Sequence, residues 1–307
     1  MIETDLIVIG AGPAGLSASL YASRSGASTI LIDQMGAGGQ VTQIDRLENY
    51  PGVFPSISGS DFIKTMLEQS KSFGVQTIFA SVNSIDKKEN NFLIKTGSEE
   101  YLSKSLIYAT GAEHTKLGIP GEDTFFGRGV SYCAVCDGPF FKGREVAVIG
   151  GGDSALSEAF YLSNIASKVH LIHRRNQFRA AQSIINKINS SKNIEVHYSN
   201  IVKEIKGMQT VDSLLLENVE TKEILSLKVD AIFIFTGMKP RTQLLEILPK
   251  DKNGYIITDE KMQTLIPGLF VAGDVRSKPL RQIVTATSDG AIAGFMAAEY
   301  IKGLSKN

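Results

Sequence analysis

The sequence lacks tryptophan, contains only two cysteines and has no excess of either charge. Its 32 Lys and Arg residues balance its 32 Asp and Glu residues, so no global field would attract nucleic acid or an anionic membrane. No apolar run approaches the length of a membrane span, and the acidic segment Met1–Asp5 lacks the basic start of a secretory signal. We therefore expect a cytoplasmic protein that binds neither nucleic acid nor membrane.

Glycine, in contrast, is abundant. The 307 residues include 29 glycines and nine prolines, with no low-complexity run. A chain of this length exceeds one minimal core, and many tight turns without low complexity are typical of compact α/β proteins. We expect two domains of ordinary size.

A glycine-rich turn follows the first apolar run. Residues 5–9 have the length and composition of a buried strand, and Gly10-Ala11-Gly12-Pro13-Ala14-Gly15 follows at once, before a helical pattern that runs to Gly26. A second apolar run, residues 27–32, ends at Asp33. Strand, G-x-G-x-x-G, helix, strand and acid in this order are the fingerprint of a dinucleotide site.

Each part of this fingerprint has a physical reason. Gly10 permits a tight turn, Gly12 lets a pyrophosphate approach the backbone, and Gly15 lets the helix pack on the strand. The helix that begins at Pro13 and Ala14 supplies free amides, from Ala14 onward, and a partial positive charge at its N terminus, and Asp33 would accept hydrogen bonds from a ribose. A lone G-x-G-x-x-G is a weak signal, but the surrounding strand, helix and acid disfavour a plain glycine turn.

The same pattern recurs in the second half of the chain. Residues 145–149 repeat the opening strand, and Gly150-Gly151-Gly152-Asp153-Ser154-Ala155 repeats its turn. In place of a ribose-binding acid, the second copy carries the basic residues His173, Arg174, Arg175 and Arg179. Arginines offer bidentate donors to a 2′-phosphate, so this site is predicted to select NADP over NAD; a solvated basic turn is the simpler alternative.

Both cysteines lie between the two fingerprints, in Cys133-Ala134-Val135-Cys136-Asp137-Gly138. A C-x-x-C pair in a reducing compartment indicates redox or metal chemistry, with two buried free thiols as the structural alternative. In dithiol exchange one thiolate attacks and the other resolves the mixed disulfide, and Asp137 would move the proton. We predict no metal site, because none of the four histidines lies at a metal-ligand spacing from the cysteines. The histidines are His114, His170, His173 and His197.

Further loops and strand ends are candidates for cofactor contacts. Ligands of parallel α/β sheets gather at the carboxyl ends of strands, where Thr110-Gly111 and Gly273-Asp274 stand. Polar or glycine-rich loops occupy residues 36–40 and 48–52, although in isolation they would be plain turns. With the first fingerprint, these segments make up a predicted set of contacts: Gly39, Gln40, Asn49, Thr110, Gly111, Gly273, Asp274, Arg281, Gln282 and Ile283.

The remaining periodic runs predict ordinary elements. A helix is expected from Phe62 to Phe73, capped by Ser60 or Asp61, and a long helix from about Gln282 to Lys302. Strands are expected at residues 75–79, 92–96 and 105–109, with alternating strand-like segments over residues 194–229. A domain boundary is expected near residues 112–116, with a return link at Pro240-Arg241.

The ordered motifs resemble one family closely, the low-molecular-weight, bacterial-type thioredoxin reductases. The likeness covers essentially the whole chain and is carried by seven segments, Gly10–Gly15, Glu48–Gly52, Ala109–Gly111, Cys133–Gly138, Gly150–Ala155, His173–Arg179 and Gly273–Val275. The sequence departs from the family pattern at Val135, where Thr is usual, and at Ser157, where Glu is frequent. Neither departure alters a cysteine, the acid or a fingerprint glycine.

This resemblance implies a fold and an activity. The implied fold is α/β, with two Rossmann-like, three-layer nucleotide-binding domains: residues 1–114 and 243–307 bind FAD, and the inserted residues 115–242 bind NADPH. The implied protein is a homodimeric flavoprotein that uses NADPH to reduce the disulfide of thioredoxin through FAD and a redox-active disulfide. That disulfide joins Cys133 and Cys136, with Cys136 nearer the flavin and Asp137 as the nearby acid. The alternatives are a reductase of another thiol or electron-transfer protein, or a flavoprotein redox sensor.

The position of the dithiol suggests a domain motion. It belongs to the inserted domain, which also carries the nicotinamide site, and both must reach one flavin. We therefore expect the domain to rotate about links near Glu113 and Arg241, presenting the two sites in turn. Arg128, Phe140 and Phe141 flank the dithiol and are candidates for docking thioredoxin, although ordinary core packing explains the aromatic residues equally well.

Overall fold

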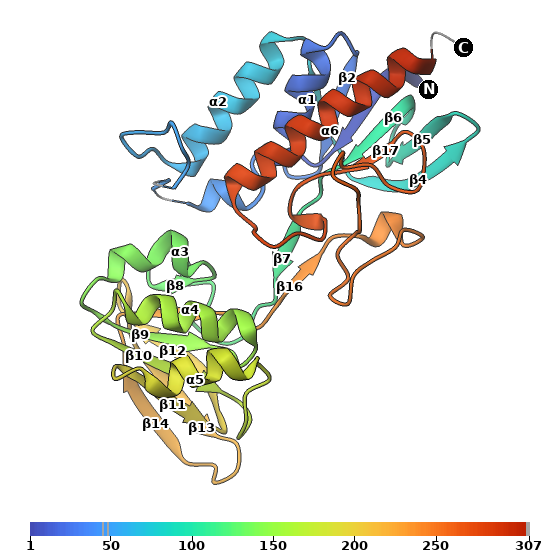
Figure 1. The fold of residues 1–307 in the computed structure, drawn as a ribbon. Helices are drawn as coiled ribbons and strands as arrows, with labels where there is room; N and C mark the ends of the chain where they lie inside the picture. The colour runs from blue at the N-terminus through green and yellow to red at the C-terminus, as the bar shows by residue number, and fades with distance from the viewer. Residues whose placement is uncertain (45, 48, 305–307) are drawn as a thin grey trace. The chain divides into compact units, whose positions relative to one another are not determined.

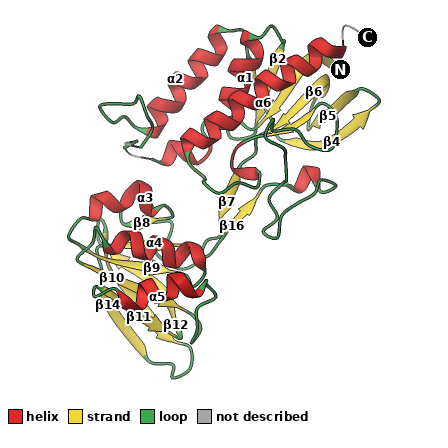
Figure 2. Ribbon diagram, in the orientation of Figure 1, coloured by secondary structure: helices red, strands yellow, loops and turns green. Residues whose placement is uncertain are grey.

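The computed structural model describes residues 1–44, 46–47 and 49–304 as two compact units (Figures 1 and 2). Unit 1 comprises Met1–Glu113 and Lys239–Asn307, and unit 2 is the segment His114–Met238 inserted between them. Each unit is built on a sheet of mainly parallel strands with helices, which confirms the predicted α/β class with two Rossmann-like folds. Glu48, part of one segment that carried the family resemblance, lies outside the described residues.

Unit 1 contains a seven-stranded sheet: six strands lie in the order β3-β2-β1-β6-β5-β4, and the seventh, β17, pairs with β6 off this path. The first four strands are parallel; the start of β6 then pairs with antiparallel β5, and its end pairs with parallel β17. Leu6, Ile7 and Val8 in β1 are fully buried, as expected for a parallel strand covered on both faces. The strand bounds are β1 Ile2–Ile9, β2 Thr29–Asp33, β3 Gln76–Phe79, β4 Val82–Lys88, β5 Asn91–Thr96, β6 Glu100–Tyr108 and β17 Leu269–Val271.

Three long helices belong to unit 1: α1 (Pro13–Arg24), α2 (Gly59–Ser72) and α6 (Ile283–Leu304). Helix α6 runs beside α1 in Figure 1, and small residues let the two backbones touch. A Cβ atom added to Gly294 would lie 2.2 Å from the Ala18 carbonyl oxygen, so a larger residue there would force the helices apart. None of the helices in the described part of the chain has both the length and the apolar character that crossing a bilayer requires.

Unit 2 contains a five-stranded parallel sheet in the order β11-β10-β9-β15-β8. Alternate residues of β9 separate its two faces: Val146 and Val148 pack with helices α4 and α5, whereas Ala147 and Ile149 pack against the antiparallel sheet β12-β13-β14. The elements of this unit are β8 Val130–Ser131, α3 Ala134–Asp137, β9 Glu145–Ile149, α4 Asp153–Ser163, β10 Lys168–His173, α5 Gln182–Ser190, β11 Ile194–Tyr198, β12 Asn200–Gly207, β13 Val211–Asn218, β14 Ile224–Lys228 and β15 Ala231–Ile234.

Two short strands carry the chain between the units. β7 (Ala112–His114) and β16 (Met238–Pro240) pair as a separate two-stranded sheet. The boundaries between the two units fall at residues 113/114 and 238/239, whereas the sequence predicts domain boundaries at 114/115 and 242/243. The short helical turns are η1 Gly39–Gln43, η2 Gly138–Phe141, η3 Gln243–Leu245 and η4 Gly273–Val275.

The predicted cap of the second helix is wrong. Helix α2 begins at Gly59 and is capped by Ser58, whose hydroxyl accepts a hydrogen bond from the Asp61 amide at 3.0 Å. The Ser58 hydroxyl also donates to the Asp61 carboxylate at 2.7 Å, so the same hydroxyl bonds both the amide and the side chain of Asp61. Ser60 and Asp61 are both residue types that favour the N-cap position, but the residue that caps the helix is Ser58, three residues before Asp61.

Candidate functional site

The glycines of the first fingerprint divide into two kinds. A Cβ atom on Gly10 would lie 2.3 Å from the Ala109 carbonyl oxygen, and one on Gly15 would lie 1.7 Å from the Gly10 carbonyl oxygen. These two glycines are therefore required by the packing of the protein itself. A Cβ atom on Gly12 would meet no atom of a described residue within 4 Å beyond its chain neighbours. The fold does not need Gly12, which leaves open space at the N terminus of α1, where amides and the helix dipole favour an anion.

Asp33, at the end of β2, holds the first fingerprint loop in place. One carboxylate oxygen accepts a hydrogen bond from the Ala11 amide and the other accepts one from the Met35 amide, both at 2.8 Å. A carboxylate has about four acceptor positions, so both oxygens keep capacity for a ribose hydroxyl. The geometry gives this side chain a structural role that is compatible with the predicted one.

Loops distant in sequence meet this turn. The Gly38 amide donates to the Ala11 carbonyl at 2.8 Å, and a Cβ atom on Gly39 would lie 3.8 Å from the Gly12 Cα. Gln40 donates through Nε2 to the carbonyl of Ala112, just beyond Thr110 and Gly111. The predicted contacts Gly39, Gln40 and Gly111 are thus brought to the same end of the sheet as the fingerprint.

The carboxy-terminal part of unit 1 adds a second side to this region. A Cβ atom on Gly273, in η4, would lie 2.7 Å from the Ala14 Cβ, so this turn abuts the start of α1. The neighbouring Asp274 carboxylate is 3.0 Å from the ammonium of Lys278, an ion pair in which the lysine side chain is buried and the aspartate is partly exposed. Asn49 donates through Nδ2 to Gln282 Oε1 at 3.1 Å, which joins the loop after η1 to the segment before α6.

The Arg281 side chain in this region has a buried atom without a hydrogen-bond partner in the described part of the chain. The Arg281 guanidinium lies 3.7 Å from the centre of the Tyr255 ring, and its Nε has no hydrogen-bond acceptor among the described residues. A buried donor of this kind is costly unless a ligand satisfies it. With the open space at Gly12 and Gly111 and the helix N terminus, the residues of unit 1 fit a dinucleotide.

The second fingerprint repeats the division of glycines. A Cβ atom on Gly150 would lie 2.4 Å from the Ala155 Cβ, and one on Gly151 would lie 2.1 Å from the His173 ring. A Cβ atom on Gly152, directly before α4, would meet no described atom within 4 Å outside its own neighbours. Gly152 corresponds in this respect to Gly12, so both copies reserve open space at the same point of the motif.

The basic segment after β10 lies against this second turn. The Arg179 amide donates to the Gly151 carbonyl at 2.7 Å, and the Ala181 amide donates to the Asp153 carboxylate at 2.7 Å. Arg174, Arg175 and Arg179 have exposed side chains, as donors for a 2′-phosphate need. Ser154, in the first turn of α4, is exposed as well.

His173 occupies a different position from the arginines. Its side chain lies beneath Gly151, only 6% exposed, and its Nε2 donates to the Gln177 carbonyl at 2.9 Å. Burial lowers the pKa of His173, and the charges of Arg174 and Arg179 lower it further, so the ring is neutral near pH 7. A direct contact between His173 and a nucleotide stays a prediction, while the structure shows the ring supporting the loop.

The two cysteines form a disulfide at the start of a short helix. Cys133 is the N-cap residue of α3, and its sulfur accepts a hydrogen bond from the Cys136 amide at 3.2 Å. Helix α3 packs against α4, and a Cβ atom on Gly138 would lie 2.8 Å from a Leu162 methyl group. The disulfide and the second fingerprint are therefore carried by elements in direct contact.

Ser131 connects Asp137 to the disulfide and has no signal in the sequence. Its hydroxyl donates to the Asp137 carboxylate at 2.6 Å and accepts from the Cys133 amide at 3.0 Å. The carboxylate is thus held beside the disulfide segment by a charge-assisted bond. A serine two residues before a C-x-x-C motif is too common to be singled out from sequence.

The segment before the disulfide is fixed by buried Glu122. Its carboxylate accepts hydrogen bonds from the amides of Leu117 and Gly118 and, at 2.6 Å, from the Tyr132 hydroxyl. Burial and this bond strongly raise the pKa of Tyr132, so the phenol stays protonated as a donor.

Of the aromatic residues that flank the disulfide, Phe141 packs edge-on against Phe233 in the core of unit 2. Phe140 is 44% exposed, and the Arg128 side chain is exposed too. Phe141 therefore has the ordinary packing role, and Phe140 and Arg128 are the flanking residues that remain accessible in unit 2.

The whole chain matches known proteins. Residues 4–290 match the family model described as pyridine nucleotide-disulphide oxidoreductase. A thioredoxin reductase of Treponema pallidum (strain Nichols) is 48% identical over 302 residues, which cover 98% of each chain. The crystal structure of thioredoxin reductase from Streptococcus pyogenes MGAS5005 has a TM-score of 0.94 at 42% identity, covering 98% of this chain and 99% of that one. Lactococcus lactis thioredoxin reductase in a state named the FR conformation has a TM-score of 0.67 at 40% identity, with 98% and 99% covered.

Proposed function

The chain belongs to the pyridine nucleotide-disulphide oxidoreductase family and has thioredoxin-disulfide reductase activity, and we propose that it performs this reaction with NADPH and FAD. FAD would bind the domain that the sequence predicts at residues 1–114 and 243–307, which is unit 1 apart from the residues at its boundaries. NADPH would bind the predicted inserted domain, residues 115–242, which corresponds in the same way to unit 2. The electrons would leave through the disulfide of Cys133 and Cys136.

One observation carries this assignment. Each of the two fingerprints holds one glycine, Gly12 or Gly152, that the packing of the protein does not require and that opens onto a helix N terminus. Two such turns in one chain support two separate dinucleotides. In unit 2, helix α4 follows the fingerprint turn and packs against α3, which begins at the disulfide. This contact supports nicotinamide and disulfide chemistry in the same unit.

FAD, when bound, supplies a centre that accepts a hydride from NADPH and passes an electron pair to a disulfide. The residues of unit 2 would then do the rest. The reduced Cys133 thiolate attacks the disulfide of thioredoxin and forms a mixed disulfide, and the Cys136 thiolate displaces the second thioredoxin sulfur and closes the internal disulfide. Each leaving thioredoxin thiolate takes up one proton, and we assign to the Asp137 carboxylate, which accepts a hydrogen bond from Ser131, the relay of one of them from the Cys136 thiol as that thiol becomes a thiolate.

The choice of nicotinamide rests on the arginines after β10. Arg174, Arg175 and Arg179 are exposed on a segment that is hydrogen-bonded to the second fingerprint. A 2′-phosphate would accept charge-assisted hydrogen bonds from them, whereas NADH offers no such group. In unit 1 the corresponding position is held by Asp33, which suits a ribose hydroxyl.

We further infer that the inserted unit changes its position during turnover. It carries both the disulfide and the second fingerprint, and each must reach the flavin of unit 1. Both connections run through β7 and β16, which are two short strands. Rotation about these links would let the nicotinamide and the disulfide meet the flavin in turn.

The direct test follows flavin absorbance. The purified yellow protein is mixed anaerobically with NADPH or with NADH, and thioredoxin is then added. We expect bleaching by NADPH, and recovery of the colour together with reduced thioredoxin. Bleaching by NADH alone would contradict the roles given to the arginines. NADPH-driven bleaching without thioredoxin turnover would favour a redox sensor or the reductase of another protein.

We also propose that the protein is a homodimer and that it is cytoplasmic, as the family implies. Helix α6 supports the dimer, because Val284, Ile292 and Phe295 expose apolar side chains to solvent in the single chain. Sedimentation equilibrium measures the mass directly, and Phe295→Glu should shift the protein towards the monomer. A wild-type protein that sediments as a monomer would exclude the dimer.

A further inference from the structure

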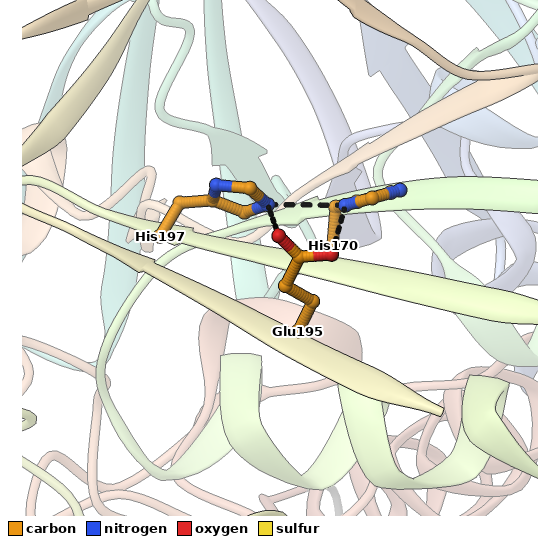
Figure 3. Close-up of side chains that lie close together, drawn as sticks. All are labelled: His170, Glu195 and His197. Atoms are coloured by element: carbon orange, nitrogen blue, oxygen red, sulfur yellow. Dashed lines mark hydrogen bonds and ion pairs between the residues drawn. The ribbon is translucent and has the colours of Figure 1, made fainter. Parts of the chain in front are cut away.

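Two histidines and a glutamate of unit 2 lie close together (Figure 3). None of the three is a ligand of the dithiol site or one of the cofactor contacts that the proposed function uses. His170 lies on β10, and Glu195 and His197 lie on the neighbouring edge strand β11. The parallel register pairs His170 with Glu195 and Ile172 with His197, so the three side chains share one face of the sheet. Within the described part of the chain, no other set of three or more His, Cys, Asp or Glu residues brings its ligand atoms together in this way.

The spacing of the three groups suits a metal ion. His170 Nδ1 and His197 Nε2 are 3.0 Å apart. Glu195 places Oε1 at 3.6 Å from His197 Nε2, and Oε2 at 3.8 Å from His170 Nδ1. Ligands held at ~2.0–2.2 Å by a tetrahedral zinc ion lie roughly 3.3–3.6 Å from one another. The three side chains therefore need only small adjustments to bind one ion.

Surrounding groups orient the ligands. The Nε2 of His170 lies 3.3 Å from the Glu145 carboxylate on β9, so the far side of the ring is held by a carboxylate. This arrangement fixes the tautomer and turns the Nδ1 lone pair towards His197, as in carboxylate–histidine–metal sites. Lys168 lies 2.6 Å from Glu195 Oε2 and leaves Oε1 for the ion.

The cluster is buried on one side and open on the other. The side chains of His170 and His197 are 3% and 12% exposed, whereas Glu195 is 48% exposed. Water can reach the Glu195 side through an open recess of about 300 Å³ lined by Ser167, Lys168, Lys192, Asn193, Ile194 and Glu195.

We propose that His170, Glu195 and His197 form a binding site for a divalent transition metal of the zinc class, with water as the fourth ligand. Two imidazoles and one carboxylate favour zinc over magnesium or calcium, which prefer all-oxygen sites. The ion would clamp the edge strand β11 to β10 and stabilise unit 2. The charge of Lys168 opposes the bound cation, so we expect an affinity in the micromolar range.

The test uses the untagged holoprotein in its oxidised state, without NADPH. Cys133 and Cys136 then remain a disulfide and offer no thiolate to zinc. Zinc is titrated against a chromophoric chelator, and the melting temperature is measured with and without the ion. We expect one ion per chain and a higher melting temperature in zinc, because an ion that binds only the folded state stabilises it. The assay requires no reductase activity, so its outcome is independent of the proposed function.

Substitutions locate the ion. His197→Gln and Glu195→Gln should each weaken zinc binding by ~10-fold or more, and Glu145→Gln, which acts through His170, should weaken it by about 10-fold. His114→Gln, a histidine change elsewhere in unit 2, should leave the affinity unchanged. Glu195 is half exposed, so its variant tests the site even where loss of a buried histidine prevents folding. Wild-type protein that binds no zinc, or equal binding by wild type and both ligand variants, would overturn the proposal.

Discussion

At the scale of single residues, Ser131 is the part of the dithiol site that the structure adds. Its hydroxyl joins the Asp137 carboxylate to the amide of Cys133. A hydrogen bond to a charged group contributes ~1.5–3 kcal/mol. If that free energy holds Asp137 in place for proton transfer, Ser131→Ala should slow thioredoxin reduction by about 10-fold or more. Stopped-flow measurements should show unchanged flavin bleaching by NADPH in the same variant.

The matched control for Ser131→Ala is Ser190→Ala at the end of α5. The Ser190 hydroxyl donates to the Lys187 carbonyl at 3.0 Å and has no contact with the dithiol segment among the interactions described. It should leave both steps at the wild-type rate. Equal slowing of both steps in Ser131→Ala would indicate a general structural role and contradict the positioning of Asp137.

Cofactor choice is also decided by single side chains. Arg174→Ala and Arg175→Ala each remove donors predicted to bind the 2′-phosphate of NADPH. Each should raise the KM for NADPH by ~10-fold or more, the equivalent of one charge-assisted hydrogen bond, and leave the KM for NADH unchanged. Steady-state kinetics with both nucleotides provide the measurement.

Arg144→Ala is the control for these arginine variants. Arg144 is an exposed residue of the same unit, but it pairs with Asp230 at 3.4 Å rather than lying on the segment after β10. Its loss should change neither KM. A proportional rise of the KM for NADH in the Arg174 or Arg175 variant would mean that the arginine does not read the phosphate.

At the scale of elements, the turn between β1 and α1 separates folding from ligand binding. Gly12 has an extended backbone, φ −74° and ψ −177°, that alanine adopts freely, and its surroundings are open. Gly12→Ala should therefore change the free energy of unfolding of the flavin-free protein by less than ~1 kcal/mol. The new methyl group would occupy the space predicted for the pyrophosphate, so the purified variant should contain little flavin. Flavin content and urea unfolding measure the two effects.

Gly15→Ala should behave in the opposite way. Its new methyl group would overlap the Gly10 carbonyl oxygen, and overpacking of this kind costs ~1–3 kcal/mol or more. Gly97→Ala, in an open turn of the same unit, is the neutral control for both variants. A destabilised Gly12→Ala protein with full flavin content would refute the division between the two glycines.

Elements with a strong local signal were predictable, and others were not. The strand–turn–helix units at Gly10 and Gly150 follow from apolar runs and glycine spacing, because those turns permit few residue types. Strand β4 was not predicted, since it is an edge strand of the sheet and most of its residues are exposed, which hides the alternation of apolar and polar residues. Helix α5 was also missed: its N-cap position holds Ala181, which gives no capping signal.

The candidate site shows the same limit. The cysteines, Asp137 and the arginines were found because each belongs to a contiguous pattern. Ser131 was missed because its role depends on a hydrogen bond that no spacing rule encodes. The grouping of His170, Glu195 and His197 depends on the register of two parallel strands, which the sequence does not encode in any simple spacing. The prediction of no metal site rested only on the spacing of histidines around the cysteines.

At the scale of the whole molecule, an insertion puts the two glycine fingerprints on separate units, which the chain joins through β7 and β16. The return link is anchored to unit 1 by its backbone: the Arg241 carbonyl accepts from the Tyr108 hydroxyl at 2.8 Å and from Thr110 Oγ1 at 2.7 Å. The Arg241 side chain pairs with Glu113 at 3.4 Å, which joins the two links to each other. Any rotation of the inserted unit must therefore take place at or beyond this pair.

A covalent bridge at this pair tests the rotation. Glu113→Cys and Arg241→Cys alter only half-exposed side chains and keep the backbone bonds of Arg241. In the oxidised protein the native cysteines are protected as a disulfide, so a bismaleimide reacts with the new pair alone and forms thioethers that survive reduction. We expect the bridged protein to lose most thioredoxin reduction, because the inserted unit would be unable to present its two sites in turn. At least one half-reaction, measured as NADPH oxidation with an artificial acceptor or as flavin oxidation by the disulfide, should persist. The same double variant treated with a monofunctional maleimide should keep full turnover, and undiminished thioredoxin reduction in the bridged protein would rule out rotation at the Glu113–Arg241 pair.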